Sequence, residues 1–462
     1  MPRDRIDIAL QDETRLAAEG VYAIARHCGE NDIVAVRAQR TIRRPEFLRD
    51  IAELGARLPA HDYVLNLCTD RYRFMVGLAA ALCRQQITLM PPSKTPGVIK
   101  AVADDYPDLY AITDDETEHL PVRSMVYPDL PNGGGTTARD MPAVPGAQPA
   151  LILFTSGSTG RPKPVPKSWG ALVRSALAAG DRLGMLRLGG ATVIGTVPHQ
   201  HSYGFESTIL LGLQHGLVVD AGGQFYPSDI RAQIKAAPRP RILVTTPVHL
   251  RALVAEPDGM PQVDLILSAT APLPVSLAAQ AESCFGAPLI EIYGCTEAGQ
   301  IATRRTVQKT HWHCLDGVAL HEDGHGTWAS GSSVHGSALL HDIIEPAGPG
   351  TFLLGGRSAD LVDVAGKRTS LAYLNHQLLS IEGVKDGVFF MPETDGQRVA
   401  RLMALVVAPK LRAESVLREL RERIDAAFLP RPLIFVDELP RNRLGKLPRE
   451  ALLELIGRGQ GL

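Results

Sequence analysis

Cysteine is scarce in this sequence and is not arranged in close pairs. The 462 residues include six cysteines, and none of them belongs to a Cys-x-x-Cys pair. This pattern excludes a dense disulfide framework and favours a reduced, cytoplasmic chain. The run HWHC at 311–314 is too tightly spaced to make a tetrahedral metal site without further ligands.

An excess of one charge and a long apolar run are missing as well. The formal net charge is −2, so nothing indicates a nucleic-acid partner. No apolar run reaches the roughly 18–20 residues that a membrane span needs. The opening residues, MPRDRIDIALQDETR, carry charges where a signal peptide needs an apolar core. We therefore expect a soluble protein with no membrane span and no nucleic-acid partner.

Helical and strand patterns alternate along most of the chain, which predicts an α/β fold with parallel strands and crossover helices. We expect helices at 44–58 and 74–86, where apolar residues recur at helical spacing. Strands are expected at 63–67, 109–113, 191–197, 241–246, 263–269 and 288–294. The segment 129–149 is rich in glycine and proline and predicts an exposed connection.

The pattern of predicted strands and helices changes after Gly356. The segments 359–368, 387–391 and 401–408 predict a small sheet, and 413–428 predicts a charged helix after it. We therefore expect two domains, at 1–356 and 357–462.

Small hydroxylated residues, glycines and lysines follow an apolar strand in the stretch LILFTSGSTGRPKPVPKSW, at 151–169. Glycine lets the backbone approach a ligand closely, and hydroxyl and N–H groups donate to phosphate oxygens. A polar turn is the alternative. A Walker A loop does not fit, because Pro162 and Pro164 would disrupt the helix that has to follow.

Three further motifs stand downstream: IYGCTEAG at 292–299, GRSADLVDVAGKR at 356–368 and LPRNRLGKLPREAL at 439–452. With the loop they resemble, in order and separation, the adenylate-forming superfamily of acyl-CoA synthetases, luciferases and peptide-synthetase adenylation domains. The resemblance covers nearly the whole chain, although the N-terminal region is short. It implies a large N-terminal domain of stacked α/β sheets and a small, mobile α+β C-terminal domain.

The resemblance also implies how ATP is bound. The residues that match the phosphate-binding loop are Thr155, Ser156, Gly157, Ser158, Thr159, Gly160 and Lys163. Tyr293, with Gly294 beside it, matches the aromatic residue that lies against adenine. Thr296 matches an α-phosphate contact, and Glu297 matches the carboxylate that holds Mg²⁺. The residues that match the ribose-binding pair are Asp342 and Arg357.

Other matched positions concern the acid and the chemistry. Lys446 matches the lysine that reaches the α-phosphate and the carboxylate in the first step. His201 matches a residue at the carboxylate pocket, whereas His199 is interpreted as a bystander. Tyr203 and Gly204 are expected to follow along the acyl channel. Thr270 and Ala271, in SATAPLP, are expected to border the acyl group.

Three positions depart from the superfamily pattern. Pro164 replaces a frequent glycine, and Asn375 stands where a glutamate is common; both changes should be tolerated. Ala359 stands at the hinge position, where Asp or Lys is commoner, so the trigger of any domain rotation is left open.

The resemblance implies an ATP-dependent, AMP-forming acid–thiol ligase. The thiol belongs to coenzyme A or to the phosphopantetheine arm of a carrier protein. An aryl acid such as a hydroxybenzoate is favoured, as in the stand-alone bacterial ligases of aryl-polyene and related pigment pathways. A medium-chain acyl-CoA synthetase and a non-catalytic acyl- or nucleotide-binding protein are the alternatives.

The charge of the last segment bears on the thiol acceptor. Residues 357–462 hold 17 lysines and arginines against 14 acidic residues. Arg441 and Arg443 lie close to Lys446 in the sequence. Because carrier proteins are typically acidic and rim charges set the association rate, this excess favours a carrier protein as acceptor. Coenzyme A is also anionic, so the charge alone leaves both acceptors open.

Overall fold

The structure is a computed structural model. The residues that it describes are 20–27, 29–38, 40–117, 119–130, 140–156, 162–223, 226–256, 259–324, 326–334, 336–357, 361–364, 367–391, 402–424, 426–442 and 447–459.

The larger of the described sheets has 11 strands. In spatial order they are β21 (Asp342–Gly348), β22 (Thr351–Arg357), β17 (Trp312–Cys314), β16 (Gly299–Arg304), β15 (Leu289–Cys295), β14 (Leu265–Ser268), β13 (Arg241–Thr245), β11 (Thr192–Gly195), β12 (Val218–Asp220), β2 (Ile33–Arg37) and β3 (Arg40–Arg43). The strands from β15 to β2 run parallel, as the alternating pattern predicts.

A second described sheet has six strands. In order they are β10 (Pro162–Ser168), β9 (Pro149–Ser156), β5 (Ile87–Met90), β4 (Tyr63–Asn66), β6 (Leu109–Thr113) and β7 (Ser124–Val126). Only β10 runs antiparallel to its neighbour in this sheet. The two prolines that exclude a helix at this point therefore lie in a strand. Two smaller sheets pair β1 (Val21–Ala23) with β8 (Ala143–Pro145) and β18 (Ala319–Asp323) with β19 (Gly326–Ser330) and β20 (Ser337–Leu340). The predicted connection at 129–149 thus contains a paired strand.

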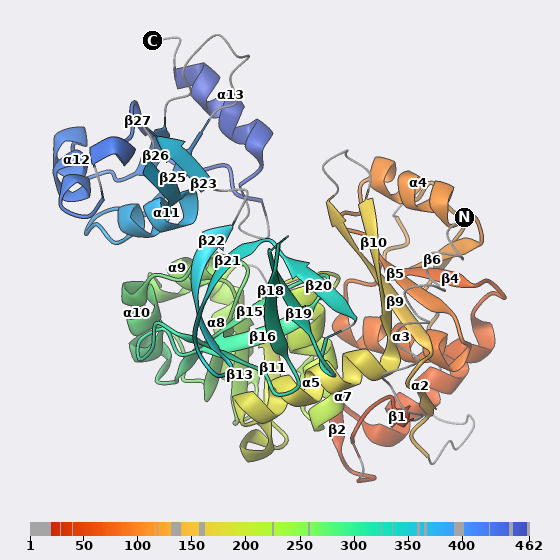
Figure 1. The fold of residues 1–462 in the computed structure, drawn as a ribbon. Helices are drawn as coiled ribbons and strands as arrows, with labels where there is room; N and C mark the ends of the chain where they lie inside the picture. Colours follow the sequence, from red (N-terminus) through yellow and green to blue (C-terminus); the bar gives the residue numbers. More distant parts are fainter. Residues whose placement is uncertain are drawn as a thin grey trace.

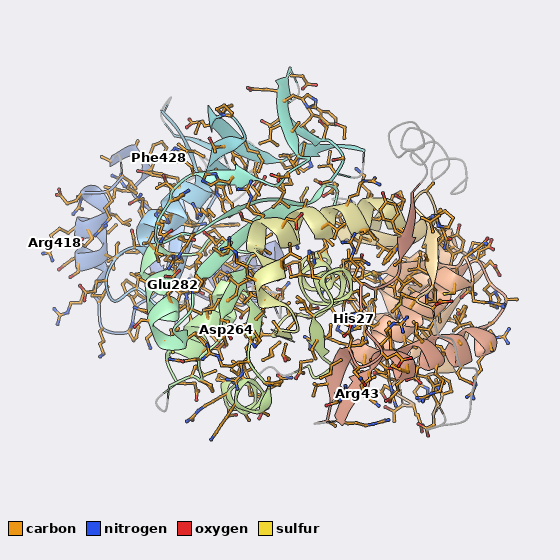
Figure 2. All side chains as sticks on the ribbon, turned by 90° about the horizontal axis from the view of Figure 1, so that it is seen from below. His27, Arg43, Asp264, Glu282, Arg418 and Phe428 are labelled. Atoms are coloured by element: carbon orange, nitrogen blue, oxygen red, sulfur yellow. The ribbon has the colours of Figure 1, made fainter. Side chains whose placement is uncertain are left out.

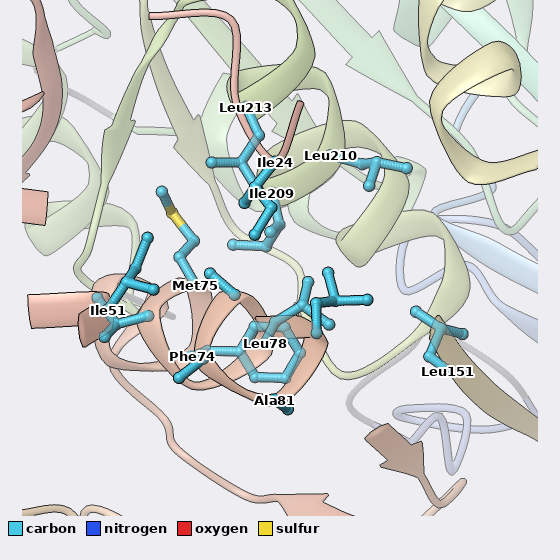
Figure 3. Packing of buried hydrophobic residues seen from close by; sticks show 14 of the residues in the cluster. Ile24, Ile51, Phe74, Met75, Leu78, Ala81, Leu151, Ile209, Leu210 and Leu213 are labelled. Atoms are coloured by element: carbon cyan, nitrogen blue, oxygen red, sulfur yellow. The ribbon is translucent and has the colours of Figure 1, made fainter. Parts of the chain in front are cut away.

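The helix α3 (Arg71–Cys83) packs between the two large sheets. Its side chains are buried almost all round, as a helix enclosed by protein requires. Phe74, Met75 and Leu78 of α3 meet Ile51 of α2 (Arg44–Arg57) and Ile209 of the π-helical segment η2 (Phe205–Leu210) in one core (Figure 3). The helix begins three residues earlier than predicted, because Asp70 accepts a hydrogen bond from the Arg73 N–H and caps it.

The remaining helices of this part are α4 (Pro96–Asp105), α5 (Trp169–Leu183), η1 (Met185–Leu188), α6 (Ser202–Gly204), α7 (Leu211–His215), α8 (Pro227–Ala236), α9 (Pro247–Val254) and α10 (Val275–Phe285). Several of them connect neighbouring parallel strands, as crossover helices do. In the described part of the chain, no helix combines the length and the apolar character that a membrane crossing requires.

The chain from α11 (Leu371–Leu379) onward forms apolar cores of its own. It contains a sheet of β25 (Asp386–Phe390), β26 (Met403–Val407) and β27 (Leu433–Phe435), with α12 (Ala413–Arg421), η4 (Ala426–Phe428) and α13 (Arg449–Gly459). This part rises above one end of the large sheet in Figure 1, and in Figure 2 Arg418 and Phe428 lie at the opposite end of the molecule from Arg43.

Two expectations about the C-terminal part are wrong. Among the described residues, the strands β23 (Leu361–Val364) and β24 (Lys367–Ser370) pair with each other and do not join the sheet of β25. The helix predicted at 413–428 ends at Arg421, although apolar residues stay buried at the same spacing as far as Phe428. The Ile424 N–H donates to the Leu420 carbonyl at 2.9 Å, so the spacing continues into a turn just beyond the end of the helix. The predicted boundary between 356 and 357 lies one residue inside β22, and it stays a prediction.

Candidate active site

The carboxyl ends of four parallel strands form one edge of the 11-stranded sheet. These strands, β11, β13, β14 and β15, end at Gly195, Thr245, Ser268 and Cys295. After β11 the chain enters β12 on one side of β11, and then returns to β13 on the other side. In open α/β sheets, ligands bind in the crevice where the strand order reverses in this way. The topology therefore indicates a binding site at the carboxyl end of β11.

Arg71 fills the β12 side of this crevice. Its guanidinium donates to the main-chain carbonyls of Gly195, Val197 and Gly222 and is fully buried. Burial lowers the pKa of Arg71 to about 10, so the group stays charged near neutral pH. The positive charge therefore lies directly under the loop that follows β11.

The β13 side of the crevice carries polar groups. Thr196 donates to the Thr245 hydroxyl over 2.9 Å, and Nδ1 of His249 lies 2.9 Å from the Thr196 oxygen. The Tyr203 hydroxyl donates to the Thr245 carbonyl over 3.1 Å. Burial lowers the pKa of His249, which favours the neutral imidazole. The half-buried Tyr203 and His249 are therefore held at the end of β13 by the buried Thr196 and Thr245.

The loop after β11 carries the residues predicted for the acid. His201 immediately precedes α6, and its carbonyl accepts the Phe205 N–H at 2.8 Å. A Cβ on Gly204 would lie 2.1 Å from the Pro198 carbonyl oxygen, so only glycine fits at this position. His199 is buried, hydrogen-bonded to the Cys68 carbonyl at 3.0 Å and edge-on to Phe74.

Thr270 follows β14 at the same edge and has a left-handed backbone. Its φ of +80° is unusual for a β-branched residue, and its side chain is exposed. Strained conformations of this kind cluster at functional sites. Ala271 follows it and is half-buried. Both predicted acyl-side residues therefore lie at the end of a strand that contributes to the crevice.

The residues predicted to bind the nucleotide lie on β15, which is next to β14 in the sheet, and on β21 and β22. The Tyr293 hydroxyl donates to Oδ2 of Asp342 over 2.7 Å, and Asp342 pairs with Arg357 across β21 and β22. A bulge after Tyr293 brings Gly294 so close to Gly299 that a Cβ would lie 2.2 Å from its carbonyl oxygen. The structure thus brings together three residues that lie up to 64 positions apart and that the sequence assigns to adenine and ribose.

Thr296 and Glu297 lie in the turn between β15 and β16, and both are half-buried. The ammonium of Lys167, on β10, donates to the main-chain carbonyl of Glu297 over 2.5 Å. This contact joins the six-stranded sheet to the turn. On that sheet Thr155 and Lys163 stand opposite each other in the β9–β10 pair.

Several predicted site residues cannot be placed. Gly157, Ser158, Thr159 and Gly160 lie outside the described residues, as do Ala359, Arg443 and Lys446. The backbones of Ser156 and Arg357 are described, but their side chains are not.

The sequence interpretation missed four polar residues of this region: Arg71, Lys167, Glu206 and His249. Arg71 follows a predicted strand and Lys167 lies within the quoted loop segment, so their positions could have drawn attention. Glu206 and His249 lie in helical segments, and no local pattern distinguishes them from solvated residues.

A single carboxylate beside a phosphate site fits Mg²⁺, which is usually held by one or two carboxylates together with phosphate oxygens and water. Glu297 supplies such a carboxylate in the turn next to Thr296. In the described part of the chain, no group of three or more His, Cys, Asp and Glu side chains is placed to hold a metal ion.

Comparison with known families agrees with this geometry. The profile described as "AMP-binding enzyme" matches residues 55–321, which is more than half of the chain. The chain therefore belongs to the AMP-binding enzyme family, and the predicted class of AMP-forming enzyme is confirmed.

Individual relatives are more distant. A 4-coumarate–CoA ligase from Rhodobacter capsulatus is 28% identical over 300 residues, which cover 64% of this chain and 74% of that protein. A 3-hydroxybenzoate–CoA ligase from Aromatoleum sp. is 24% identical over 391 residues, which cover 73% of this chain and 72% of that protein.

A solved structure with the same fold is O-succinylbenzoate coenzyme A synthetase from Bacillus subtilis in complex with ATP and magnesium. It superposes with a TM-score of 0.78 at 20% identity, over 94% of this chain and 99% of that chain. The predicted α/β fold class with a large and a small domain is thereby confirmed.

Proposed function

We propose that this protein is an ATP-dependent ligase that joins an aryl acid to the thiol of coenzyme A. One observation carries the proposal. Tyr293, which bonds Asp342, lies near the carboxyl end of β15, and His201 follows the carboxyl end of β11 on the same edge of the parallel sheet. Base and ribose contacts on one side and an acid pocket on the other are what the joining of ATP and an acid requires.

In the first step of the proposed reaction, a carboxylate oxygen attacks the α-phosphorus of ATP and pyrophosphate leaves. Two anions have to approach each other, so neutralising and aligning them dominates the barrier. We assign the phosphate contacts to Thr155, Lys163 and Thr296, and the movable charge at the reacting atoms to Lys446. Mg²⁺, held by Glu297, would neutralise phosphate charge when bound.

In the second step the thiol attacks the acyl carbonyl carbon, and AMP leaves with the electron pair of the broken bond. We propose that the C-terminal part, 357–462, rotates between the steps. The rotation withdraws Lys446 and brings the β23–β24 hairpin to the thiol entrance. Such domain movement allows one site to perform two reactions.

The polar end of the crevice supports an aryl acid with a hydrogen-bonding substituent. The half-buried Tyr203 offers a ring for stacking, and the half-buried His249, held by the buried Thr196 hydroxyl, offers a hydrogen-bonding imidazole. Two relatives named above act on 4-coumarate and 3-hydroxybenzoate, which are acids of this type. A hydroxybenzoate is therefore the proposed substrate class. A cytoplasmic location and a role in a pigment pathway stay predictions.

The acceptor proposed is coenzyme A, since the named relatives are CoA ligases. A carrier protein would be attracted by Arg441 and Arg443, which lie close to Lys446 in the sequence. Arg441 is engaged in a two-bond ion pair with Asp386, at 2.6 and 2.7 Å. That pairing leaves less of the charge of Arg441 available to a docking partner.

Exchange of labelled pyrophosphate into ATP tests the first step. The assay compares hydroxybenzoates, 4-coumarate and medium-chain fatty acids, each with and without enzyme. We expect exchange that is at least tenfold faster with an aryl acid than with a fatty acid. Faster exchange with medium-chain acids would favour the fatty acyl-CoA synthetase. ATP binding without exchange for any acid would favour the non-catalytic alternative.

Transfer to coenzyme A and to a holo carrier protein, at low and high salt, tests the acceptor. We expect faster thioester formation on coenzyme A. Faster transfer to the carrier that weakens with salt would overturn this choice and support the carrier protein.

A further inference from the structure

Lys167 is a buried lysine outside the residues assigned above to ATP and the acid. Only 3% of its surface is exposed, and its ammonium donates to the Glu297 carbonyl over 2.5 Å. Burying an ammonium is costly unless partners compensate the charge. A lysine that is kept in such a position needs a counter-charge and a function.

The charge of Lys167 acts on a second buried group, the carboxylate of Glu206 on η2. Glu206 is 8% exposed, and it accepts hydrogen bonds from the Ser202 hydroxyl at 2.6 Å and from the Gln300 N–H at 3.1 Å. Burial raises the pKa of Glu206, while the Ser202 hydrogen bond and the charge of Lys167 act in the opposite direction. The charges of the two side chains therefore attract each other within the protein interior.

These contacts connect the three regions that the proposed reaction has to align. Lys167 lies four residues from Lys163 on β10, so both side chains are on the same face of the phosphate-side strand. The Glu297 carbonyl and Gln300 belong to the turn and strand beside the proposed metal ligand. Ser202 immediately follows His201, at the end of the loop after β11 that carries the residues predicted for the acid, which we call the acid loop.

We propose that Lys167 and Glu206 are positioning residues, which hold the Thr296–Glu297 turn and the acid loop at fixed places relative to the phosphate-side strand. The inference rests on the proposed function for the identity of the three regions. Misplacement of reacting groups by about 1 Å costs on the order of 100-fold in rate. A rigid internal link between the three regions therefore has a direct effect on adenylation.

A purely structural role makes a different prediction. Replacing both members of a buried charge pair by neutral side chains of similar volume is often neutral for stability, whereas removing one member is destabilising. The double variant Lys167→Met/Glu206→Gln removes both charges. The amide oxygen that Glu206→Gln keeps can accept the hydrogen bond from the Gln300 N–H, and the new NH2 group can donate to the Ser202 hydroxyl oxygen. The double variant therefore separates positioning from folding.

The experiment measures MgATP affinity by calorimetry, pyrophosphate exchange as a function of Mg²⁺, and thermal unfolding. For the double variant we expect an unfolding midpoint within a few degrees of the wild type, at least tenfold slower exchange and a higher half-saturating Mg²⁺ concentration. The single variant Lys167→Arg should exchange faster than the double variant, because arginine keeps a charged donor at this position.

Lys94→Met is the matched control. Lys94 also donates to a main-chain carbonyl, that of Leu67, over 2.5 Å, but it lies in neither β10 nor the Glu297 turn. This variant should leave the Mg²⁺ dependence unchanged. An equal effect of Lys94→Met, or wild-type MgATP affinity and exchange in the double variant, would overturn the inference.

The calorimetric measurement needs no acid, so it separates the two proposals. If the wild type binds MgATP but exchanges with no acid, the proposed substrate class is wrong. The inference about Lys167 is then still decided by whether the double variant binds MgATP more weakly.

Discussion

At the scale of single residues, the described chain keeps several histidines neutral by burying them. Burial lowers the pKa of His27, His199, His215 and His249, and for His199 it lowers the pKa well below 6.5. The unfolded chain takes up these protons below about pH 6.5. Since the unfolded state then binds more protons, the free energy of unfolding falls as the pH falls through this range.

His199→Phe tests this linkage. The Cys68 carbonyl keeps a donor in this variant, because Gln200 also donates to it over 2.7 Å. Between pH 6.5 and 5.5 we expect the free energy of unfolding to fall less steeply than in the wild type, by up to about 1.4 kcal/mol per pH unit. Urea unfolding at three pH values measures the slope. The exposed His321→Gln is the control, and equal slopes in all three proteins would contradict the prediction.

Lys446 carries the sharpest expectation about catalysis. Lys446→Ala should slow acyl-adenylate formation by roughly 10²–10³-fold, the usual effect of losing one preorganised charge contact. Thioester formation from preformed acyl-adenylate should be little affected, since the lysine is proposed to act on the α-phosphate in the first step. Separate assays of the two steps measure this difference. Lys410→Ala, at an exposed position in the same part of the chain, should change neither step.

Glu297 is expected to act through the metal. Glu297→Gln keeps the size of the side chain and removes its charge, so the fold should persist while the half-saturating Mg²⁺ concentration rises several-fold. Initial rates of pyrophosphate exchange over a range of Mg²⁺ concentrations measure this. An unchanged Mg²⁺ dependence would remove Glu297 from the metal role.

At the scale of elements, the acid loop depends on a close approach of main chain to main chain. Gly204→Ala places a methyl group 2.1 Å from the Pro198 carbonyl oxygen, which forces α6 away from the loop. Such overpacking typically costs about 1–3 kcal/mol. We expect a lower unfolding midpoint and a raised KM for the acid, with the KM for ATP less changed. Gly97→Ala, where nothing lies within 4 Å, should be neutral or stabilising.

The elements also show how far sequence reasoning reaches. Periodicity predicts α2 to within one residue at its end, because its apolar side chains face a single core. It places the start of α3 three residues too late, since the cap at Asp70 precedes the first apolar residue. Pairing is harder to predict: the separation of β23 and β24 from the sheet of β25 depends on contacts that strand patterns do not encode.

The candidate site, too, could be predicted from the sequence only in part. Motif order identifies Tyr293 and Asp342, and the structure adds that they share a hydrogen bond. Lys167 and Glu206 escape detection, because their importance lies in which distant segments they join. Lys167 lies on β10 and Glu206 lies in the helical segment η2, so no local spacing indicates that both contact the region of β15 and β16.

At the scale of the whole molecule, one acidic side chain links the C-terminal part to the large sheet region. Asp386 of β25 binds Arg441 at 2.6 Å and lies 3.9 Å from Arg251 of α9. Arg441 precedes Lys446 by five residues. Arg441 is therefore connected to α9 through Asp386, five residues before the lysine proposed to act in the first step.

Asp386→Asn should weaken this connection. We expect acyl-adenylate formation to slow by about tenfold, the effect of losing one charged hydrogen bond, about 1.4 kcal/mol. Transfer from preformed acyl-adenylate should be retained, since the second step as proposed does not use Lys446. Single-turnover assays of each step measure the difference. Glu419→Gln breaks an exposed ion pair between Glu419 of α12 and Arg423, which follows the helix. This variant should leave both steps unchanged.

The pairing of β2 with β12 has a consequence for synthesis of the chain. The strand β2 lies at residues 33–37, but its parallel partner β12 is synthesised only when the ribosome has passed residue 220. Until then the β2–β3 hairpin lies at an open edge, exposed to pairing with other nascent chains. The large sheet therefore assembles late in translation, and slow synthesis between residues 43 and 218 should increase aggregation more than slow synthesis after residue 357.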